Sequence, residues 1–265
     1  MSSGRRVILT RPSNENQAWA SGLQAAGHTV LTWPLIDITT VAHPRQIASA
    51  LANLNSYQAV MFVSRNAVNH ALAIAAGELD WSHTRCWVTG PGSRQALTDA
   101  GIPTHAIDSP DEAAAQFDTE ALWRVVQPQL QTDQAVLILR GSEADQADTA
   151  QEGVGRDWLM QQLQAAGVQV QTLAVYQRQC PVWDQALLAQ ACDAATDGSV
   201  WVFSSSQAVA NLQKLLPEQD WSSAIALATH ARIAQAATQA GFTQVQICKP
   251  VLAALIASLE SRHEQ

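Results

Sequence analysis

The sequence repeats itself, and this repetition constrains the fold more than any other feature of the chain. Three pairs of segments recur in the same order at a nearly constant separation: 23–27 and 163–167, 62–68 and 203–209, and 89–101 and 229–241. The first pair is the pentapeptide Leu-Gln-Ala-Ala-Gly in both copies, and each copy follows an apolar segment that ends in arginine, Arg11 or Arg140. Constant order and spacing indicate an internal duplication, so both halves should contain the same elements in the same order.

Short apolar segments alternate with amphipathic ones throughout each copy. In the first copy we expect strands near 6–10, 29–33, 59–63, 86–89 and 104–107. We expect helices near 14–26, 45–53, 66–76, 92–100 and 119–130. Alternation of short strands with helices predicts right-handed βαβ connections and parallel sheets. The expected fold class is therefore α/β, with two doubly wound parallel-sheet domains of similar plan. The second copy has additional acidic residues, Ser142–Gly155, which we expect to form a solvated loop.

Two equivalent segments, Val30–Ile38 and Val170–Arg178, are predicted to be partly exposed strands. Each runs into polar residues and then a proline, Pro44 or Pro181, which suits a connection between domains. A cut between the copies near position 131 would leave each strand inside its own domain. The alternative is interleaved, with one domain from 1–36 plus 178–265, a second from 40–172, and linkers at 35–41 and 172–179. The duplication by itself is compatible with both arrangements.

Composition argues against several classes of function. The formal net charge of −8 is the wrong sign for general binding to nucleic acids or anionic membranes. The four cysteines lie far apart without a C-x-x-C pair, which predicts reduced thiols in the cytoplasm. The chain shows no signal-peptide pattern and no apolar segment approaching the ~18 residues of a membrane-spanning helix. We expect a cytoplasmic monomer, because neither a heptad repeat nor a large apolar stripe calls for a partner.

Hydroxyl groups, glycines and arginines occur where the expected strands end. Ligands of open α/β sheets bind at these ends, beside the free N–H groups of helix N-termini. The residues at these positions are Arg11, Ser64, Arg65, Asn66, Thr89, Gly90, Ser93, Arg140, Gly141, Ser204, Ser205 and Thr229. Serine and threonine are also common helix caps, so each position alone has a structural explanation, and His230 is expected to be such a cap. Together, with few carboxylates among them, they predict a site for anionic groups.

Most motifs of catalysis are absent from the sequence. It contains no G-x-S-x-G, no G-x-x-x-x-G-K-[ST] and no H-E-x-x-H, which argues against an esterase elbow, a P-loop and a zinc site. Gly90 and Gly92 imitate the start of a dinucleotide fingerprint, but Gln95 stands where the third glycine belongs. A nucleotide-dependent enzyme is therefore a distant alternative, and we expect neither a cofactor nor a metal.

Segments spread over nearly the whole chain resemble the uroporphyrinogen-III synthase family. They are Val7–Pro12, Ala59–Val68, Phe117–Leu122, Val136–Gly141, Gly155–Leu159, Ala174–Arg178, Val202–Ser205, Lys249–Pro250 and Ala254–Leu255. The resemblance depends on their order along the chain rather than on one diagnostic motif. It departs from the family pattern at 229–232, where a Gly-x-x-Thr-Ala turn has lost its glycine, while Gly90–Arg94 keeps the glycine and a hydroxyl. Ligand contact near Thr229 is therefore the weaker of these two expectations.

The resemblance implies the interleaved architecture, joined by a two-stranded linker with the site in the cleft. It also implies a hydro-lyase of haem biosynthesis that needs no cofactor. Such an enzyme closes hydroxymethylbilane, a polycarboxylate, to uroporphyrinogen III with loss of water and inversion of the last pyrrole. Tyr176 occupies the position of the family's cleft tyrosine and is the candidate proton donor, although its hydroxyl could instead order the linker. The competing class is a non-catalytic two-domain protein that binds an anionic small molecule, because binding needs the same donors.

Overall fold

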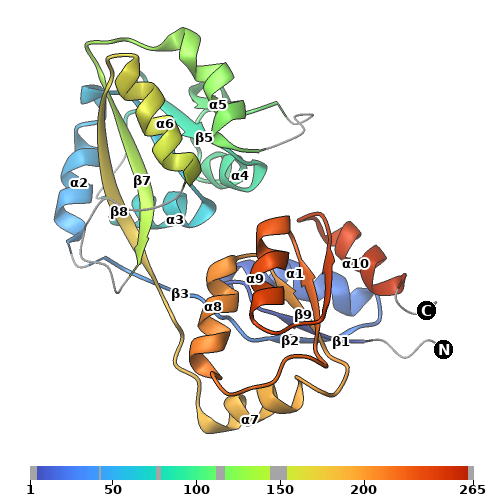
Figure 1. Ribbon diagram of the computed structural model, residues 1–265. Coiled ribbons are helices and arrows are strands. Elements are labelled where there is room, and N and C mark those ends of the chain that lie inside the picture. The colour runs from blue at the N-terminus through green and yellow to red at the C-terminus, as the bar shows by residue number, and fades with distance from the viewer. Residues whose placement is uncertain (1–4, 42, 76–78, 112–116, 144–153, 262–265) are drawn as a thin grey trace. The chain divides into compact units, whose positions relative to one another are not determined.

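The chain divides into two compact units, which are described separately here by their own sheets. The computed structural model describes residues 5–41, 43–75, 79–111, 117–143 and 154–261 (Figure 1). The terminal unit consists of Met1–Ile38 and Gln179–Gln265, and the central unit consists of Thr39–Arg178. The chain therefore enters the central unit at Thr39 and returns to the terminal unit after Arg178. Among the described residues, no helix is long and apolar enough to cross a membrane.

The terminal unit contains a five-stranded parallel sheet in the order β11-β10-β9-β1-β2. Its strands are β1 (Arg6–Leu9), β2 (Thr29–Thr32), β9 (Val200–Phe203), β10 (Ile225–Ala228) and β11 (Gln244–Ile247). Its helices are α1 (Ser13–Ala25), α7 (Gln185–Asp193), α8 (Ser206–Leu215), α9 (Ala231–Gln239) and α10 (Leu252–Glu260). The first two strands come from the start of the chain and the last three from its end, so distant segments form one sheet.

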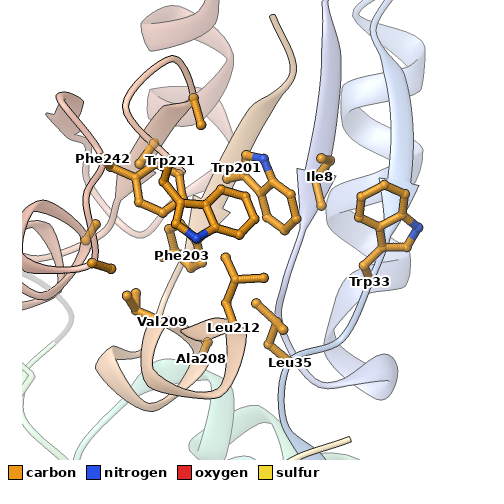
Figure 2. Packing of buried hydrophobic residues seen from close by; sticks show 14 of the residues in the cluster. Ile8, Trp33, Leu35, Trp201, Phe203, Ala208, Val209, Leu212, Trp221 and Phe242 are labelled. Atoms are coloured by element: carbon orange, nitrogen blue, oxygen red, sulfur yellow. The ribbon is translucent and has the colours of Figure 1, made fainter. Parts of the chain in front are cut away.

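Side chains on both faces of this sheet are buried, as expected for a doubly wound fold. On one face Trp201 packs against Trp221, with ring centroids 5.3 Å apart, and Trp221 stacks on Phe242 at 5.2 Å (Figure 2). On the other face the neighbouring strand residues Val200 and Val202 belong to a separate aliphatic cluster. Successive residues of a strand point to opposite faces, so one apolar run serves both cores.

The central unit contains a six-stranded sheet in the order β3-β8-β7-β4-β5-β6. Its strands are β3 (Asp37–Thr39), β4 (Tyr57–Phe62), β5 (Arg85–Val88), β6 (Ile107–Asp108), β7 (Ala135–Glu143) and β8 (Gln169–Gln179). Its helices are α2 (Pro44–Ala52), α3 (Arg65–Ile74), α4 (Pro91–Asp99), α5 (Thr119–Val126) and α6 (Val154–Ala165), with 3₁₀ turns at Leu54–Ser56, Thr104–Ala106 and Gln127–Gln129. Figure 1 shows its two longest strands, β7 and β8, side by side, and their register is parallel.

The predicted class, α/β with two parallel sheets of similar plan, is confirmed. Each copy of the duplication supplies its first two strands to one unit and its last three to the other. The terminal order β11-β10-β9-β1-β2 therefore repeats in the central unit as β6-β5-β4-β7-β8, with β3 added at the edge. The sheets interleave the two copies because β1 pairs with β9 and β7 pairs with β4.

Val30–Ile38 is not a single strand, contrary to expectation. β2 ends at Thr32 in the terminal sheet, and β3 begins at Asp37 beside β8 in the central sheet. Pro34 lies between them and lacks the N–H that a continuous strand would use. The intervening Leu35 and Ile36 are buried in the aromatic cluster of the terminal unit, so the residues that begin the predicted linker belong to a core.

Val170–Arg178, by contrast, lies within one strand, β8. It pairs with β7 as far as Arg178, which is registered with Glu143. Glu143 was expected in a solvated loop, yet its carboxylate forms an ion pair with Arg178 at 2.7 Å. The predicted loop Ser142–Gly155 is wrong at both ends, because Ser142 continues β7 and Gly155 belongs to α6. Residues 144–153 of that stretch lie outside the described residues, as does position 76 at the end of the expected helix 66–76.

Candidate functional site

Tyr176 lies in β8 and meets the start of helix α3 within the central unit. Its side chain is 5% exposed, and its hydroxyl oxygen is 3.2 Å from Oγ of Ser64. Ser64 follows strand β4 and is the N-cap of α3, where its Oγ accepts a hydrogen bond from the N–H of Ala67 at 3.1 Å. Serine is favoured at this position because its oxygen satisfies an N–H that the helix leaves free. Two candidates that lie far apart in sequence, Ser64 and Tyr176, are thus in direct contact.

Gly141 makes room for the ring of Tyr176. The two residues are registered with each other across β7 and β8, beside an irregularity between Arg140 and Gly141. A Cβ atom built on Gly141 would lie 2.5 Å from Cζ of Tyr176 and 2.9 Å from its hydroxyl oxygen. We expected Gly141 at the end of a strand, facing ligand, but β7 continues to Glu143 because β8 pairs with it that far. The structure gives this glycine a steric role beneath the tyrosine.

His70 completes the surroundings of the tyrosine and was not among the predicted residues. It lies on α3, and its ring centroid is 5.6 Å from that of Tyr176, with an interplanar angle of 34°. Partial burial lowers the pKa of His70, because the charged imidazolium loses solvation there. The lowered pKa favours the neutral form of the imidazole. Sequence reasoning could not find this residue, because its contact is with a strand much later in the chain.

The remaining candidates of the central unit lie near the carboxyl ends of β4 and β5 and beside β7. These three strands are neighbours in the sheet. Arg65 is exposed, and its Nε donates a hydrogen bond to the carbonyl of Gly92 at 3.1 Å, which connects the first turns of α3 and α4. Gly90 is the N-cap of α4, directly after the half-buried Thr89, and Ser93 is buried in the first turn of that helix. Asn66 is buried at the start of α3.

Arg140 is placed level with the end of β4, where the N–H of Val63 donates to the carbonyl of Leu139. Its side chain is half-buried, and its Nε has no hydrogen-bond partner among the residues that the structure describes. A buried guanidinium nitrogen normally has an acceptor. Arg140 therefore has a buried donor without a recorded acceptor, close to the strand ends that are followed by Ser64 and Thr89.

The candidates of the terminal unit form a separate group at the ends of β1, β9 and β10. Arg11 is already engaged, because its Nη2 lies 2.6 Å from the carboxylate of Glu15 and its Cζ lies 4.7 Å from the ring centroid of Trp19. This pairing leaves Arg11 less available to an anionic ligand than its position in the sequence indicated.

Two side chains of this group, Ser205 and His230, cap helices. Ser205 is the N-cap of α8 and accepts from the N–H of Gln207 at 3.2 Å, while Ser204 is half-buried beside it. The N–H of Thr229 donates to the carbonyl of Phe203. His230 is the N-cap of α9, as predicted, and its Nδ1 accepts from the N–H of Arg232 at 3.1 Å. Within the described ranges, no three His, Cys, Asp or Glu side chains gather to hold a metal ion.

Fold and site together define a class: a duplicated α/β protein whose two parallel sheets each take strands from both copies, with helix N-termini at the strand ends. The family model described as uroporphyrinogen-III synthase HemD matches residues 17–257. This match spans most of the chain. The protein therefore belongs to the uroporphyrinogen-III synthase family.

Individual relatives agree with this assignment. The chain is 26% identical over 228 residues to a uroporphyrinogen-III synthase of Synechococcus elongatus, covering 84% of this chain and 80% of that protein. It is 28% identical over 183 residues to the Salmonella typhimurium enzyme of the same name, covering 68% of each. Solved structures of uroporphyrinogen III synthases from Helicobacter pylori and, as a mutant, from Thermus thermophilus share the fold. The Helicobacter pylori structure has a TM-score of 0.61 at 14% identity and covers 97% of this chain and 99% of its own. The Thermus thermophilus mutant has a TM-score of 0.55 at 17% identity and covers 99% of this chain and 100% of its own.

Proposed function

We propose that this protein catalyses the closure of hydroxymethylbilane to uroporphyrinogen III, with loss of water and inversion of the last pyrrole. The observation that carries the proposal is the family match over residues 17–257. The proposed enzyme is a hydro-lyase that works in the cytoplasm as a monomer and without a cofactor. Relatives that bear the name uroporphyrinogen-III synthase support the same activity.

The reaction requires that one carbon–oxygen bond break as water leaves and that a carbon–carbon bond form at the substituted carbon of the last pyrrole. Inversion then requires that the older bond from this carbon to its methylene bridge break and that the bridge bond instead to the free α carbon of the same pyrrole, which loses a proton. Hydroxymethylbilane closes unaided to the non-inverted isomer, so the enzyme has to favour a different point of attack. Where no nucleophile takes part, an enzyme can accelerate this reaction by positioning the substrate and by stabilising the charge that develops. We assign to Tyr176 the donation of a proton to the departing hydroxyl, which a phenol can perform.

The carboxylates of the substrate need donors, and the central unit supplies three kinds. Arg140 has a buried Nε without a partner among the described residues, and Arg65 is an exposed cation. The first turns of α3 and α4 present N–H groups and the positive end of the helix dipole. In the terminal unit, Ser204, Ser205 and Thr229 would bind through hydroxyl or backbone groups. Arg11 would bind a substrate carboxylate only after its ion pair with Glu15 has been broken.

One assay tests the proposal directly. Purified protein is mixed with freshly generated hydroxymethylbilane, and the products are oxidised and separated into the two isomers. We expect mainly uroporphyrinogen III, formed faster than spontaneous closure. If only the non-inverted isomer appears, at the spontaneous rate, the enzyme assignment is wrong. Retention of the substrate without turnover would then favour the binding-protein alternative.

A further inference from the structure

The contact between Tyr176 and Ser64 leaves a choice of hydrogen-bond direction. A serine hydroxyl has one proton to donate and two lone pairs that accept. One lone pair of Ser64 already accepts from the N–H of Ala67 at 3.1 Å. The proton and the second lone pair of Ser64 are left for the Tyr176 hydroxyl. The two oxygens lie 3.2 Å apart, and either could be the donor.

Proton donation by Tyr176 selects one of the two directions. If Tyr176 donates to Ser64, its proton is occupied and unavailable to a substrate. If Ser64 donates, the phenol proton is free, and the same bond stabilises the negative oxygen left after the proton has gone. Ser64 also stands at the N-terminus of α3, a helix of ten residues whose dipole favours negative charge at this end. The hydroxyl of Ser64 at this position is therefore well placed to stabilise a phenolate.

We infer that Ser64 is a positioning residue that acts through Tyr176, donating its hydroxyl proton to the phenol oxygen and stabilising the phenolate formed during the reaction. This inference depends on the proposed function. As Tyr176 gives its proton to the departing hydroxyl, the carbon–oxygen bond breaks and water leaves. Attack at the substituted carbon of the last pyrrole forms a carbon–carbon bond, the older bond from that carbon to its methylene bridge then breaks, and the bridge bonds to the free α carbon of the same pyrrole. The proton that this α carbon loses returns to the phenolate. The step therefore needs no additional reactant and leaves the protein unchanged.

Two further contacts hold the phenol where Ser64 can reach it. Gly141 admits the ring against β7, because any side chain there would overlap it. His70 packs against the ring, at 5.6 Å between centroids. Tyr176 is only 5% exposed, so little of the residue as a whole is open to bulk water. The hydroxyl of Ser64 is thus the one side-chain hydrogen-bond partner that the structure records for the Tyr176 hydroxyl within the described residues.

The test is a double-mutant cycle in the isomer assay, with Ser64→Ala measured in the native and the Tyr176→Phe backgrounds. We expect Ser64→Ala to lower kcat by about tenfold to a hundredfold, the effect of one hydrogen bond to a charged group, with KM nearly unchanged. In the Tyr176→Phe background the same substitution should have no further effect, because no phenolate forms. Ser64→Thr keeps the hydroxyl and the cap, and it should retain most of the activity.

Two controls separate the hydroxyl from helix capping. Ser64→Gly removes the hydroxyl at a smaller capping cost than Ser64→Ala, and it should show the same loss of kcat. Asp118 caps α5 in the same unit, accepting from the N–H of Ala121 at 2.8 Å, so Asp118→Ala loses a comparable cap and should keep native kcat. An equal loss from Ser64→Ala in both backgrounds would overturn the inference, as would native turnover of Tyr176→Phe. A rise in KM alone would instead indicate that Ser64 binds substrate directly. In each case formation of uroporphyrinogen III by the native protein would leave the proposed function intact.

Discussion

The steric role of Gly141 gives the sharpest prediction for stability. A Cβ on this residue would lie 2.5 Å from Cζ of Tyr176, whereas real Cβ atoms essentially never approach a heavy atom closer than 3.0 Å. The ring is confined on its other sides by α3, through Ser64 and His70, so it cannot move away without breaking those contacts. Gly141→Ala should therefore destabilise the protein by about 1–3 kcal/mol, the usual cost of overpacking a filled site.

Urea denaturation of the native protein and the Gly141→Ala variant measures this difference. If the ring is the obstacle, its removal should relieve the cost. Gly141→Ala should then be close to neutral in a Tyr176→Ala background. Gly90→Ala is the matched control, because a Cβ at Gly90 has no heavy atom within 4 Å, and its cost should be limited to the poorer capping by alanine. A cost for Gly141→Ala that is the same with and without the Tyr176 ring would refute the steric reasoning.

Three further predictions concern Tyr176 as the proposed proton donor, its neighbour His70 and the core of the terminal unit. Tyr176→Phe should lower turnover by up to ~10²–10⁴-fold with folding intact, the range for general acid–base assistance. Tyr57→Phe should leave turnover unchanged, since that hydroxyl bonds to Gln171 instead. The depressed pKa of His70 means that the unfolded chain binds a proton more readily, so stability should fall as pH drops below about 6.5, and His70→Gln should flatten this dependence. Trp201→Ala should destabilise the protein by about 3–5 kcal/mol, because the indole is fully buried.

A different outcome would contradict each of these predictions. Native turnover of Tyr176→Phe in the isomer assay would leave the phenol a structural role only. A stability profile from pH 5 to 8, measured by urea denaturation, that is identical for native protein and His70→Gln would contradict the effect of burial on that histidine. A loss for Trp201→Ala below about 1 kcal/mol in the same denaturation assay would mean that the aromatic cluster relaxes around the gap.

Local sequence patterns predicted the elements of this protein well. The expected strands near 29–33 and 86–89 correspond to β2 and β5, and the helix expected near 92–100 corresponds to α4. The N-cap role of His230 was also visible, because a polar residue between a strand and a helix commonly caps the helix. Such patterns depend on periods of 2 and 3.6 residues, which neighbouring residues along the chain determine.

The contacts around Tyr176 could not be predicted in the same way. Gly141 was visible as a candidate for ligand binding, but its steric role depends on the tyrosine across β7 and β8. His70 carried no signal at all, and the pairing of Arg11 with Glu15 was missed although the two residues are only four positions apart in the sequence. These outcomes depend on which side chains meet in space, and residue type alone does not specify that.

The sequence by itself determined the duplication, the alternation of strands and helices and the α/β class. The tertiary structure decided whether each strand pairs with a strand of its own copy or of the other copy. Because β4 and β9 are equivalent in the duplication, β1 has a similar apolar partner in either copy, and local pattern does not distinguish them. In the structure β1 pairs with β9, and β7 pairs with β4. Strand pairing is a non-local choice, settled by the packing of both sheet faces and by breaks such as Pro34 between β2 and β3, which sends the chain from one sheet to the other.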